Sequence, residues 1–295
     1  MIYIAESGST KCDAVFLEND GVEVARIRTI GFNPYFHSSE FIDTELKKVK
    51  EIAEYGAKVD HVYFFGAGCS SPSLNQKVAA GLTASFPNAK IEVDHDLMAC
   101  AYATYTGEPA ISCILGTGSN SVYFDGKSIT KGISGLGYIL GDEGSASYIG
   151  KKVLSAYLYK QLPQNMMCDF EETFKITPDE VRQRVYNMPH VNVFLGSFAP
   201  FAHKHINHEF FYKLVYEGFE SFIKTQVMYF PEATQVPIHF VGSIAHHFEA
   251  VLKDVISNLK LKMGHVVRRP LDGLVQYYLG NIHSAKAPQQ PKTLS

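Results

Sequence analysis

A repeated order of strand, small-residue turn, strand and Asp-Gly turn constrains this chain most. It occurs first in MIYIAESGSTKCDAVFLENDG and again in AISCILGTGSNSVYFDG. A shift of 110 residues places Ser7-Gly8-Ser9 over Thr117-Gly118-Ser119, and Asp20-Gly21 has a counterpart in Asp125-Gly126 after a slightly shorter arm. Such self-similarity indicates an internal duplication. We therefore expect two related α/β units, with ligands bound in the cleft between them.

Apolar periodicity gives the order of elements in the first unit as β-β-β-α-β-α-β-α. Asn19-Asp20-Gly21 is a strong hairpin signal, and serines at 38 and 39 are candidate caps for the first helix. The predicted strands cover 1–6, 12–18, 22–30, 61–68 and 89–94, and the predicted helices cover about 38–52, 72–86 and 96–107.

The second half has a long helical stretch inserted after its first hairpin. Helical periodicity dominates residues 145–230, and 237–252 predicts one more buried strand, a Gly-Ser turn and a helix. Residues 284–295 carry Pro and polar residues with no periodicity, which predicts a disordered tail. We predict an N-terminal lobe at 1–108 and a C-terminal lobe at 109–283.

Composition narrows the functional classes. Of 295 residues, 46% are apolar and 19% charged, as in an ordinary globular enzyme, and the net charge of −3 argues against nucleic-acid binding. No stretch approaches the ~20 apolar residues of a membrane span, and the start resembles no signal peptide, so we expect a cytoplasmic protein. The five cysteines lack paired C-x-x-C spacing and are interpreted as reduced core thiols.

Three Gly-Ser/Thr turns, each after a buried strand, form the main candidate site. Glycine lets phosphate oxygens approach the main chain, where successive N–H groups and hydroxyl side chains can bind them. A tight hairpin also needs glycine without any ligand, so each turn alone is weak evidence. Together they predict a nucleotide phosphate site made of Ser7, Gly8, Ser9, Thr10, Lys11, Gly116, Thr117, Gly118, Ser119, Gly242 and Ser243.

Four segments, in order over residues 1–280, resemble the motifs of the actin-like ATPase superfamily. ESGSTKCDAV is similar to its first phosphate motif, ILGTGSNSV to the second, and FVGSIAHHF to the adenosine motif; GDEGSASYIG is the most specific match. The closest resemblance is to the N-acetylglucosamine kinase group, which shares a family with ATPases of the benzoyl-CoA reductase activator type. It implies two duplicated, ribonuclease H-like lobes, each with a mixed five-stranded sheet flanked by helices.

The resemblance assigns roles to two carboxylates. Asp96 follows a strand at a helix start, where spacing alone suggests an N-cap. In the related kinases this junction carries the general base that accepts a proton from the acceptor hydroxyl. Glu6 stands where the family usually has Asp, and its longer side chain is expected to hold Mg²⁺ through a different arrangement of water. ATP and Mg²⁺ are the implied cofactors.

Four further residues are implied as contacts of a sugar substrate. They are Asn33, Ser70, Thr117 and Asp142, and three of them have a structural alternative. Asn33 precedes Pro and can simply form a turn, Ser70 or Ser71 can cap a helix, and Asp142 with Glu143 can be a solvated pair in a loop. The spacing of His203, His205 and His208 does not favour a metal site on one helix face.

Three functions compete on this evidence. The first is a kinase for an amino sugar such as N-acetylglucosamine, a small-molecule enzyme whose relatives often pair as homodimers. The second is an ATPase that activates a partner metalloenzyme through an iron-sulfur cluster. Such a cluster is held by cysteines in glycine-rich loops, and Cys69 is the only cysteine of this sequence in such a setting. The third is a nucleotide sensor or sugar-responsive repressor, but the chain begins directly in a strand and not in a helix-turn-helix.

Overall fold

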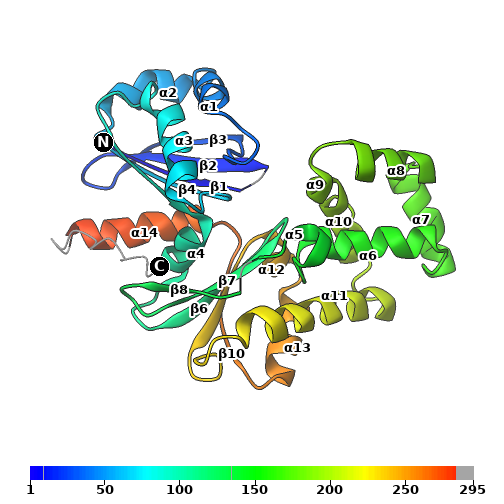
Figure 1. The fold of residues 1–295 in the computed structure, drawn as a ribbon. Helices are drawn as coiled ribbons and strands as arrows, with labels where there is room; N and C mark the ends of the chain where they lie inside the picture. The colour runs from blue at the N-terminus through cyan, green and yellow to red at the C-terminus, as the bar shows by residue number, and fades with distance from the viewer. Residues whose placement is uncertain (9, 134, 284–295) are drawn as a thin grey trace. The chain divides into compact units, whose positions relative to one another are not determined.

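The computed structural model describes residues 1–8, 10–133 and 135–283. It divides into two compact units (Figure 1), one made of Met1–Tyr105 with the chain from Arg269 onward, the other of Thr106–Arg268. The first boundary falls close to the predicted position 108. The end of the chain differs from the prediction, because residues assigned to the C-terminal lobe return to the first unit. The predicted tail at 284–295 lies outside the described residues.

The first unit contains a five-stranded mixed sheet in the order β3-β2-β1-β4-β5. β1, β2 and β3 are antiparallel neighbours, whereas β4 and β5 run parallel to β1. The strands are β1 (Ile2–Ser7), β2 (Lys11–Leu17), β3 (Glu23–Ile30), β4 (His61–Gly66) and β5 (Lys90–His95).

Helices cover both faces of this sheet (Figure 1). One face carries α1 (Ser39–Leu46), α2 (Lys50–Tyr55), the short 3₁₀ helix Gly56–Lys58 and α3 (Pro72–Thr83); the other carries α4 (Asp96–Thr104) and α14 (Pro270–His283). The predicted helix at 38–52 is two helices, of which the first is capped by the Ser38 hydroxyl, which accepts a hydrogen bond from the Phe41 N–H. This satisfies one of the N–H groups that a helix start leaves unpaired.

Strand alternation decides which side chains reach each face. In β1, Tyr3 and Ala5 pack in the apolar core with Ile42 of α1 and Leu82 of α3. Residues one position away point to the opposite face because side chains alternate along a strand. Glu6 therefore lies on the face that α4 and α14 cover.

The second unit repeats the same topology. Its sheet has the order β10-β9-β6-β7-β8, with antiparallel β6-β7-β8 and with β9 and β10 parallel to β6. The strands are β6 (Ala110–Leu115), β7 (Ser119–Phe124), β8 (Ile129–Lys131), β9 (Pro237–Val241) and β10 (Lys262–Val267). Two mixed five-stranded sheets flanked by helices confirm the predicted fold class and the duplication.

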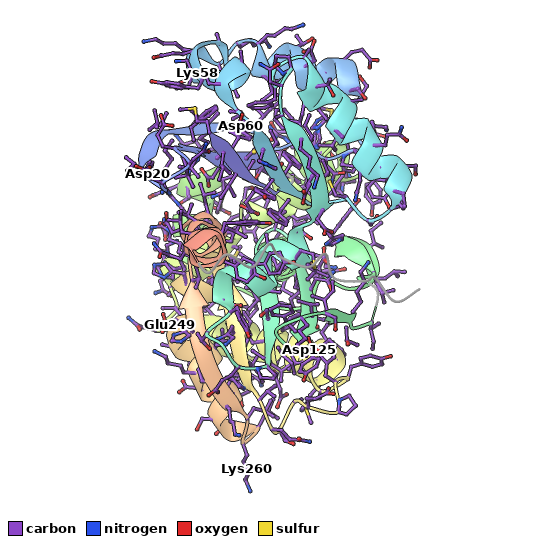
Figure 2. All side chains as sticks on the ribbon, turned by 90° about the vertical axis from the view of Figure 1, so that its left-hand side faces the viewer. Asp20, Lys58, Asp60, Asp125, Glu249 and Lys260 are labelled. Atoms are coloured by element: carbon purple, nitrogen blue, oxygen red, sulfur yellow. The ribbon has the colours of Figure 1, made fainter. Side chains whose placement is uncertain are left out.

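The two hairpin turns use the same local chemistry. Gly21 and Gly126 both have positive φ, at 91° and 93°. The Asp20 carboxylate accepts a hydrogen bond from the Val22 N–H, and the Asp125 carboxylate accepts one from the Lys127 N–H. Both aspartates are marked in Figure 2. Each Asp-Gly pair thus supplies a side-chain acceptor and a left-handed glycine, the two features that make it a turn signal.

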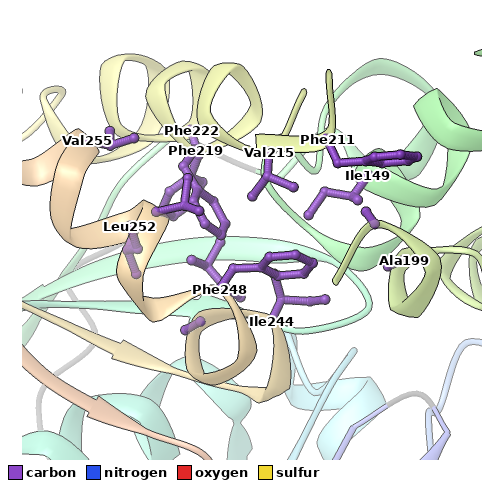
Figure 3. Packing of buried hydrophobic residues seen from close by; sticks show 14 of the residues in the cluster. Ile149, Ala199, Phe211, Val215, Phe219, Phe222, Ile244, Phe248, Leu252 and Val255 are labelled. Carbon is purple, nitrogen blue, oxygen red and sulfur yellow. The ribbon is translucent and has the colours of Figure 1, made fainter. Parts of the chain in front are cut away.

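Most helices of the second unit follow β8 in the chain. They pack around an apolar core rich in phenylalanine, in which Phe211, Phe219 and Phe222 are fully buried (Figure 3). They are α5 (Gly137–Leu140), α6 (Ala146–Leu158), α7 (Gln164–Phe174), α8 (Pro178–Asn187), α9 (Val191–Gly196), α10 (Ala199–Lys204), α11 (Glu209–Phe222), the π-helical turn Ile223–Val227, α12 (Ser243–His247) and α13 (Glu249–Asn258).

Helix α14 returns to the first unit because its apolar side chains complete that unit's core. Tyr278 is 6% exposed and its ring centroid lies 4.2 Å from that of Tyr63 on β4. Gly273 allows α14 to approach α4 closely, since a Cβ there would lie 2.2 Å from the carbonyl oxygen of Ala103. The ring contacts of Tyr277 with Tyr102 and of Tyr278 with Tyr63 therefore join α14 to the first unit.

Two further sequence expectations can be compared with the fold. Four of the five cysteines are buried as expected, but Cys168 on α7 is exposed, so the interpretation of all five as core residues was wrong for it. Among the described residues, no helix has the length and apolar character required to cross a bilayer.

Candidate active site

The carboxyl ends of three parallel strands meet in the first unit. Ser7 at the end of β1 is in register with Gly66 of β4, and Gly66 is in register with His95 of β5. The connections that leave these ends carry the first phosphate turn, the loop 67–71 and the start of α4. Ligands of α/β sheets commonly bind where such strand ends lie side by side. The topology therefore collects the predicted residues of this unit at one edge of the sheet.

Acidic side chains gather on one face at this edge. Glu6 is the cross-strand partner of Asp13, and Asp13 is the partner of Arg28, whose Nε lies 2.5 Å from the Asp13 carboxylate. Burial, then the charges of Asp96 and Asp13, raise the pKa of Glu6 to about 8. Asp13 was not a predicted site residue, and only the strand register places it beside Glu6.

The first phosphate turn is closed by its main chain. The Gly8 N–H donates to the Lys11 carbonyl oxygen at 2.9 Å, and Thr10 and Lys11 are exposed. Ser7 is fully buried, and its hydroxyl accepts a hydrogen bond from the Phe32 N–H at 2.7 Å. The Ser7 hydroxyl thus ties the turn to the Asn33 loop. Ser9 lies outside the described residues.

Asp96 is the first residue of α4, and the N-cap is His95. The His95 Nδ1 accepts a hydrogen bond from the Leu97 N–H at 3.1 Å, which is the capping contact. The capping interpretation of Asp96 was therefore wrong, because the strand continues one residue further than the sequence suggested. The Asp96 carboxylate is left for another role, and it is close enough to Glu6 and to Cys69 to raise the pKa of both.

Two loops beside this edge hold the predicted sugar contacts of the first unit. The Asn33 Oδ1 accepts a hydrogen bond from the Tyr35 N–H, and a Cβ on Gly68 would lie 2.4 Å from that oxygen. The hydroxyls of Tyr35 and Ser70 are 3.1 Å apart. Asn33 forms the expected Asn-Pro turn through its oxygen, and no described protein group accepts a hydrogen bond from its Nδ2. Ser71, and not Ser70, caps α3.

The second unit brings its two predicted turns together. The Gly116 N–H donates to the Gly118 carbonyl at 3.0 Å, which closes the turn between β6 and β7. A Cβ on Gly242 would lie 2.3 Å from the Leu115 carbonyl oxygen and 3.3 Å from the Gly116 nitrogen. Because β6 and β9 are parallel neighbours, the turns that follow them lie next to each other. Ser243, which begins α12, is exposed beside them.

Asp142 packs on the same turn. Its Oδ1 accepts a hydrogen bond from the Ser119 N–H at 3.4 Å, and a Cβ on Gly118 would lie 3.0 Å from its Oδ2. Burial raises the pKa of Asp142 above its usual range. The N-terminus of α6 is fixed to this turn as well, since the Ala146 N–H donates to the Gly116 carbonyl. GDEGS is therefore an integral part of the second turn.

The donor atoms suit a magnesium ion that keeps ligands from nucleotide and water. Within the described ranges, no three His, Cys, Asp or Glu side chains are arranged to hold a metal. Mg²⁺ usually binds one or two carboxylates together with substrate phosphates and several waters, and a buried carboxylate whose pKa is raised by its neighbours gains from a nearby cation. Glu6 fits this role, with Asp13 as its neighbour.

The three histidines of FAHKHINHEF have separate structural roles. The His205 Nε2 lies 2.5 Å from an Asp169 carboxylate oxygen, and the His208 ring caps α11 by accepting from the Phe210 N–H. The His203 ring packs against His247, with 5.1 Å between the ring centroids. These different partners explain their spacing without a shared ligand.

Comparisons with known proteins show the family and the fold of this chain. Residues 6–204 match the BadF/BadG/BcrA/BcrD ATPase family. A structure from Porphyromonas gingivalis, of a protein proposed to be an N-acetylglucosamine kinase, is 36% identical, with a TM-score of 0.91 over 95% of this chain and 99% of that one. Comparison with curated proteins gave no match.

Two more distant structures share the fold alone. A protein from Chromobacterium violaceum, also proposed to be an N-acetylglucosamine kinase, is 15% identical, with a TM-score of 0.72 over 94% of this chain and 98% of that one. A ROK family glucokinase from Streptomyces griseus, in complex with glucose and AMPPNP, is 12% identical, with a TM-score of 0.56 over 94% and 97%.

Proposed function

Since this chain belongs to the BadF/BadG/BcrA/BcrD ATPase family, we propose that it is an ATP-dependent sugar kinase. The acceptor is a hydroxyl group of an amino sugar, N-acetylglucosamine or a close relative. One observation carries the proposal: the Asp96 carboxylate lies at the start of α4 without capping it, beside the strand ends that carry the first phosphate turn. The 36% identity to the Porphyromonas gingivalis protein supports the choice of sugar.

Asp96 is the general base in this proposal. Its Oδ1 is buried and lies next to His95, so Oδ2 is the oxygen that accepts the hydroxyl proton. As the O–H bond breaks, the sugar oxygen forms a bond to the γ-phosphorus, and the bond from the γ-phosphorus to the bridging oxygen breaks to release ADP. Holding base and hydroxyl together is the main contribution that a kinase makes to such a transfer.

The glycine turns bind the phosphates of ATP. In each unit considered by itself, main-chain N–H groups of the glycine turn (at Gly8 in the first and at Gly116–Ser119 in the second) can donate to phosphate oxygens, and Lys11 adds a positive charge in the first. Gly242 and Ser243 provide the surface for the nucleoside. Magnesium, bound to the nucleotide and to Glu6, would neutralise charge that develops on the phosphoryl oxygens.

Asn33 and Ser70 bind the sugar in this proposal. Both lie on loops that meet through the Tyr35 hydroxyl, and the Nδ2 of Asn33 can donate to a sugar oxygen.

The activator function receives less support from the cysteines. Cys69 is 2% exposed, and burial, together with the nearby Asp96 and Asp94, raises the pKa of its thiol to about 12. A cluster ligand must be a thiolate. Cys69 is therefore poorly suited to hold an iron-sulfur cluster.

A panel of acceptors tests the proposal. ADP release would be measured by a coupled assay with N-acetylglucosamine, N-acetylmannosamine, glucose and no sugar. We expect N-acetylglucosamine or its close relative to raise the rate well above the rate without sugar. An ADP release rate that is the same with every sugar and without sugar would contradict a sugar kinase and favour an activator or sensor.

A further inference from the structure

The neighbour of the proposed base is a histidine that touches it directly. The His95 Nδ1 lies 2.5 Å from the Asp96 Oδ1, and the two side chains are 17% and 21% exposed. The same Nδ1 is 3.1 Å from the Leu97 nitrogen. The Asp96 Oδ1 is shielded from solvent and has no hydrogen-bond partner among the described residues, so its short contact with His95 is an ion pair only when the ring is protonated. One ring nitrogen therefore faces both a carboxylate oxygen and a main-chain N–H group.

These two contacts require opposite protonation of Nδ1. A deprotonated Nδ1 accepts a hydrogen bond from the Leu97 N–H, whereas only a protonated Nδ1 can donate to the Asp96 Oδ1. Without a proton between them, the lone pairs of Nδ1 and of an ionised Oδ1 would repel at 2.5 Å. A proton on Nδ1 removes this repulsion and gives the buried Oδ1 a hydrogen-bond donor, in place of the hydrogen bond that Nδ1 accepts from the Leu97 N–H.

We propose that His95 is a positioning residue for the base, and that its protonated ring holds the Asp96 carboxylate so that Oδ2 faces the acceptor hydroxyl. The inference rests on the proposed function of Asp96. During transfer, the hydroxyl proton moves to Oδ2 while the Nδ1–H continues to donate to Oδ1, so His95 neither gains nor loses a proton. When His95 is deprotonated, Nδ1 accepts a hydrogen bond from the Leu97 N–H and no longer holds the carboxylate.

Other titratable groups lie around the His95–Asp96 pair, and a substitution of His95 does not change them. Asp94 on β5 accepts a hydrogen bond from the His95 N–H, and Glu6 on β1 is near Asp96. Cys69, in the loop after β4, is the remaining titratable group shown to interact with Asp96. Replacing His95 alone leaves these groups in place, so a difference between pH profiles reports His95.

Two substitutions separate capping from positioning. His95→Asn supplies an oxygen for the Leu97 N–H and an amide N–H for the Asp96 carboxylate, and it does not titrate. His95→Ser keeps a good helix cap but is too short to reach the carboxylate. Both variants should fold, because the cap is retained.

The first experiment measures kcat and KM for ATP between about pH 5.5 and 9. For His95→Ser we expect kcat to fall about 10-fold or more, with KM for ATP within about 2-fold of wild type. His95→Asn should restore most of kcat, and the decline in kcat that deprotonation of His95 causes at higher pH should be absent. A wild-type kcat and pH profile in His95→Ser would overturn the proposal, as would an unchanged alkaline decline in His95→Asn.

The second experiment does not depend on turnover. The ring signals of His95 would be titrated by NMR in the wild type and in Asp96→Asn. Loss of the carboxylate should lower the His95 midpoint by about one pH unit or more, because an adjacent negative charge favours the imidazolium. An unchanged midpoint would overturn the proposal. If no sugar is phosphorylated but this midpoint moves, the proposed function fails while the His95–Asp96 pair is confirmed.

Discussion

The backbone of Gly242 packs directly against the end of β6 at Leu115. A Cβ on Gly242 would lie 2.3 Å from the Leu115 carbonyl oxygen, and Gly242 has a φ of 126°, which side chains with a Cβ rarely adopt. This contact places the turn at Gly242–Ser243 beside the turn at Gly116–Ser119 within one unit. Three of the predicted glycines, Gly116, Gly118 and Gly242, therefore belong to a single surface.

Replacing Gly242 should damage both stability and nucleotide binding. Gly242→Ala adds a clash to an already strained backbone, and we expect it to lower the free energy of unfolding by about 3 kcal/mol or more. ATP affinity should fall as the two turns separate. Urea unfolding and calorimetric titration with ATP measure the two effects.

Gly280→Ala is the matched control for this substitution. Gly280 lies in α14, and nothing is within 4 Å of the Cβ it would gain. Alanine in a helix is favoured over glycine by about 0.5–1 kcal/mol, so this variant should be slightly more stable than wild type. Equal stability of the two variants would mean that the contact at Leu115 is unimportant.

The raised pKa of Glu6 predicts a pH dependence of stability. Burial, then Asp96 and Asp13, raise its pKa from 4.5 to about 8, so the folded protein holds a proton that the unfolded chain has released over this range. This contribution to stability is fully present below pH 4.5 and is lost as pH rises through about 8. Glu6→Gln removes the titration, and the variant should gain stability relative to wild type as pH rises.

Urea unfolding of Glu6→Gln and wild type at about pH 5 and pH 9 checks this expectation. Mg-ATP should in addition displace the Glu6 proton, so its binding should release protons from wild type and not from the variant. The same stability difference at both pH values would show that Glu6 is ionised throughout.

His239 predicts an acid sensitivity that is unrelated to catalysis. Its ring on β9 is 2% exposed, and Nδ1 accepts a hydrogen bond from the His265 N–H at 2.9 Å. Burial, then the neighbouring His265, lower its pKa from 6.5 to about 4. The contribution of neutral His239 to the free energy of unfolding is therefore fully present above pH 6.5. It is lost as pH falls through about 4, by about 3 kcal/mol in total.

His239→Gln keeps a neutral hydrogen-bond acceptor and should lose this acid dependence. Unfolding free energies at about pH 7 and pH 4 measure it, with the exposed His246→Gln as the control that should behave as wild type. An acid dependence that survives in His239→Gln would assign it to other groups.

Local signals made much of the fold predictable from the sequence. The hydrogen bonds and the positive φ angles that form the turns at Asp20-Gly21 and Asp125-Gly126 involve neighbouring residues only, so the two hairpins could be located without any tertiary contact. Helix α14 could not be assigned to its unit, because its place depends on packing of Tyr278 against Tyr63, which is 215 residues away in the chain (278 − 63). Long-range packing of this kind has no local sequence signal.

The types of residue at the candidate site were predictable from the sequence, whereas their neighbours and the cap of α4 were not. Glycine turns and Asp96 were found from motifs, whereas the neighbours Asp13 and His95 required the strand register. One extra residue in β5 changes the helix cap from Asp96 to His95. Element ends are the least certain part of a sequence-based assignment, and here the end of one strand decides which residue caps α4.

The destination of the γ-phosphoryl group tests the central proposal most directly. With γ-labelled ATP and N-acetylglucosamine or its close relative, the wild type should form one sugar phosphate for each ADP. Asp96→Asn should lower this rate by about 10² or more while ATP affinity stays within a few-fold. Release of inorganic phosphate without any sugar phosphate, or near-normal transfer by Asp96→Asn, would contradict the account.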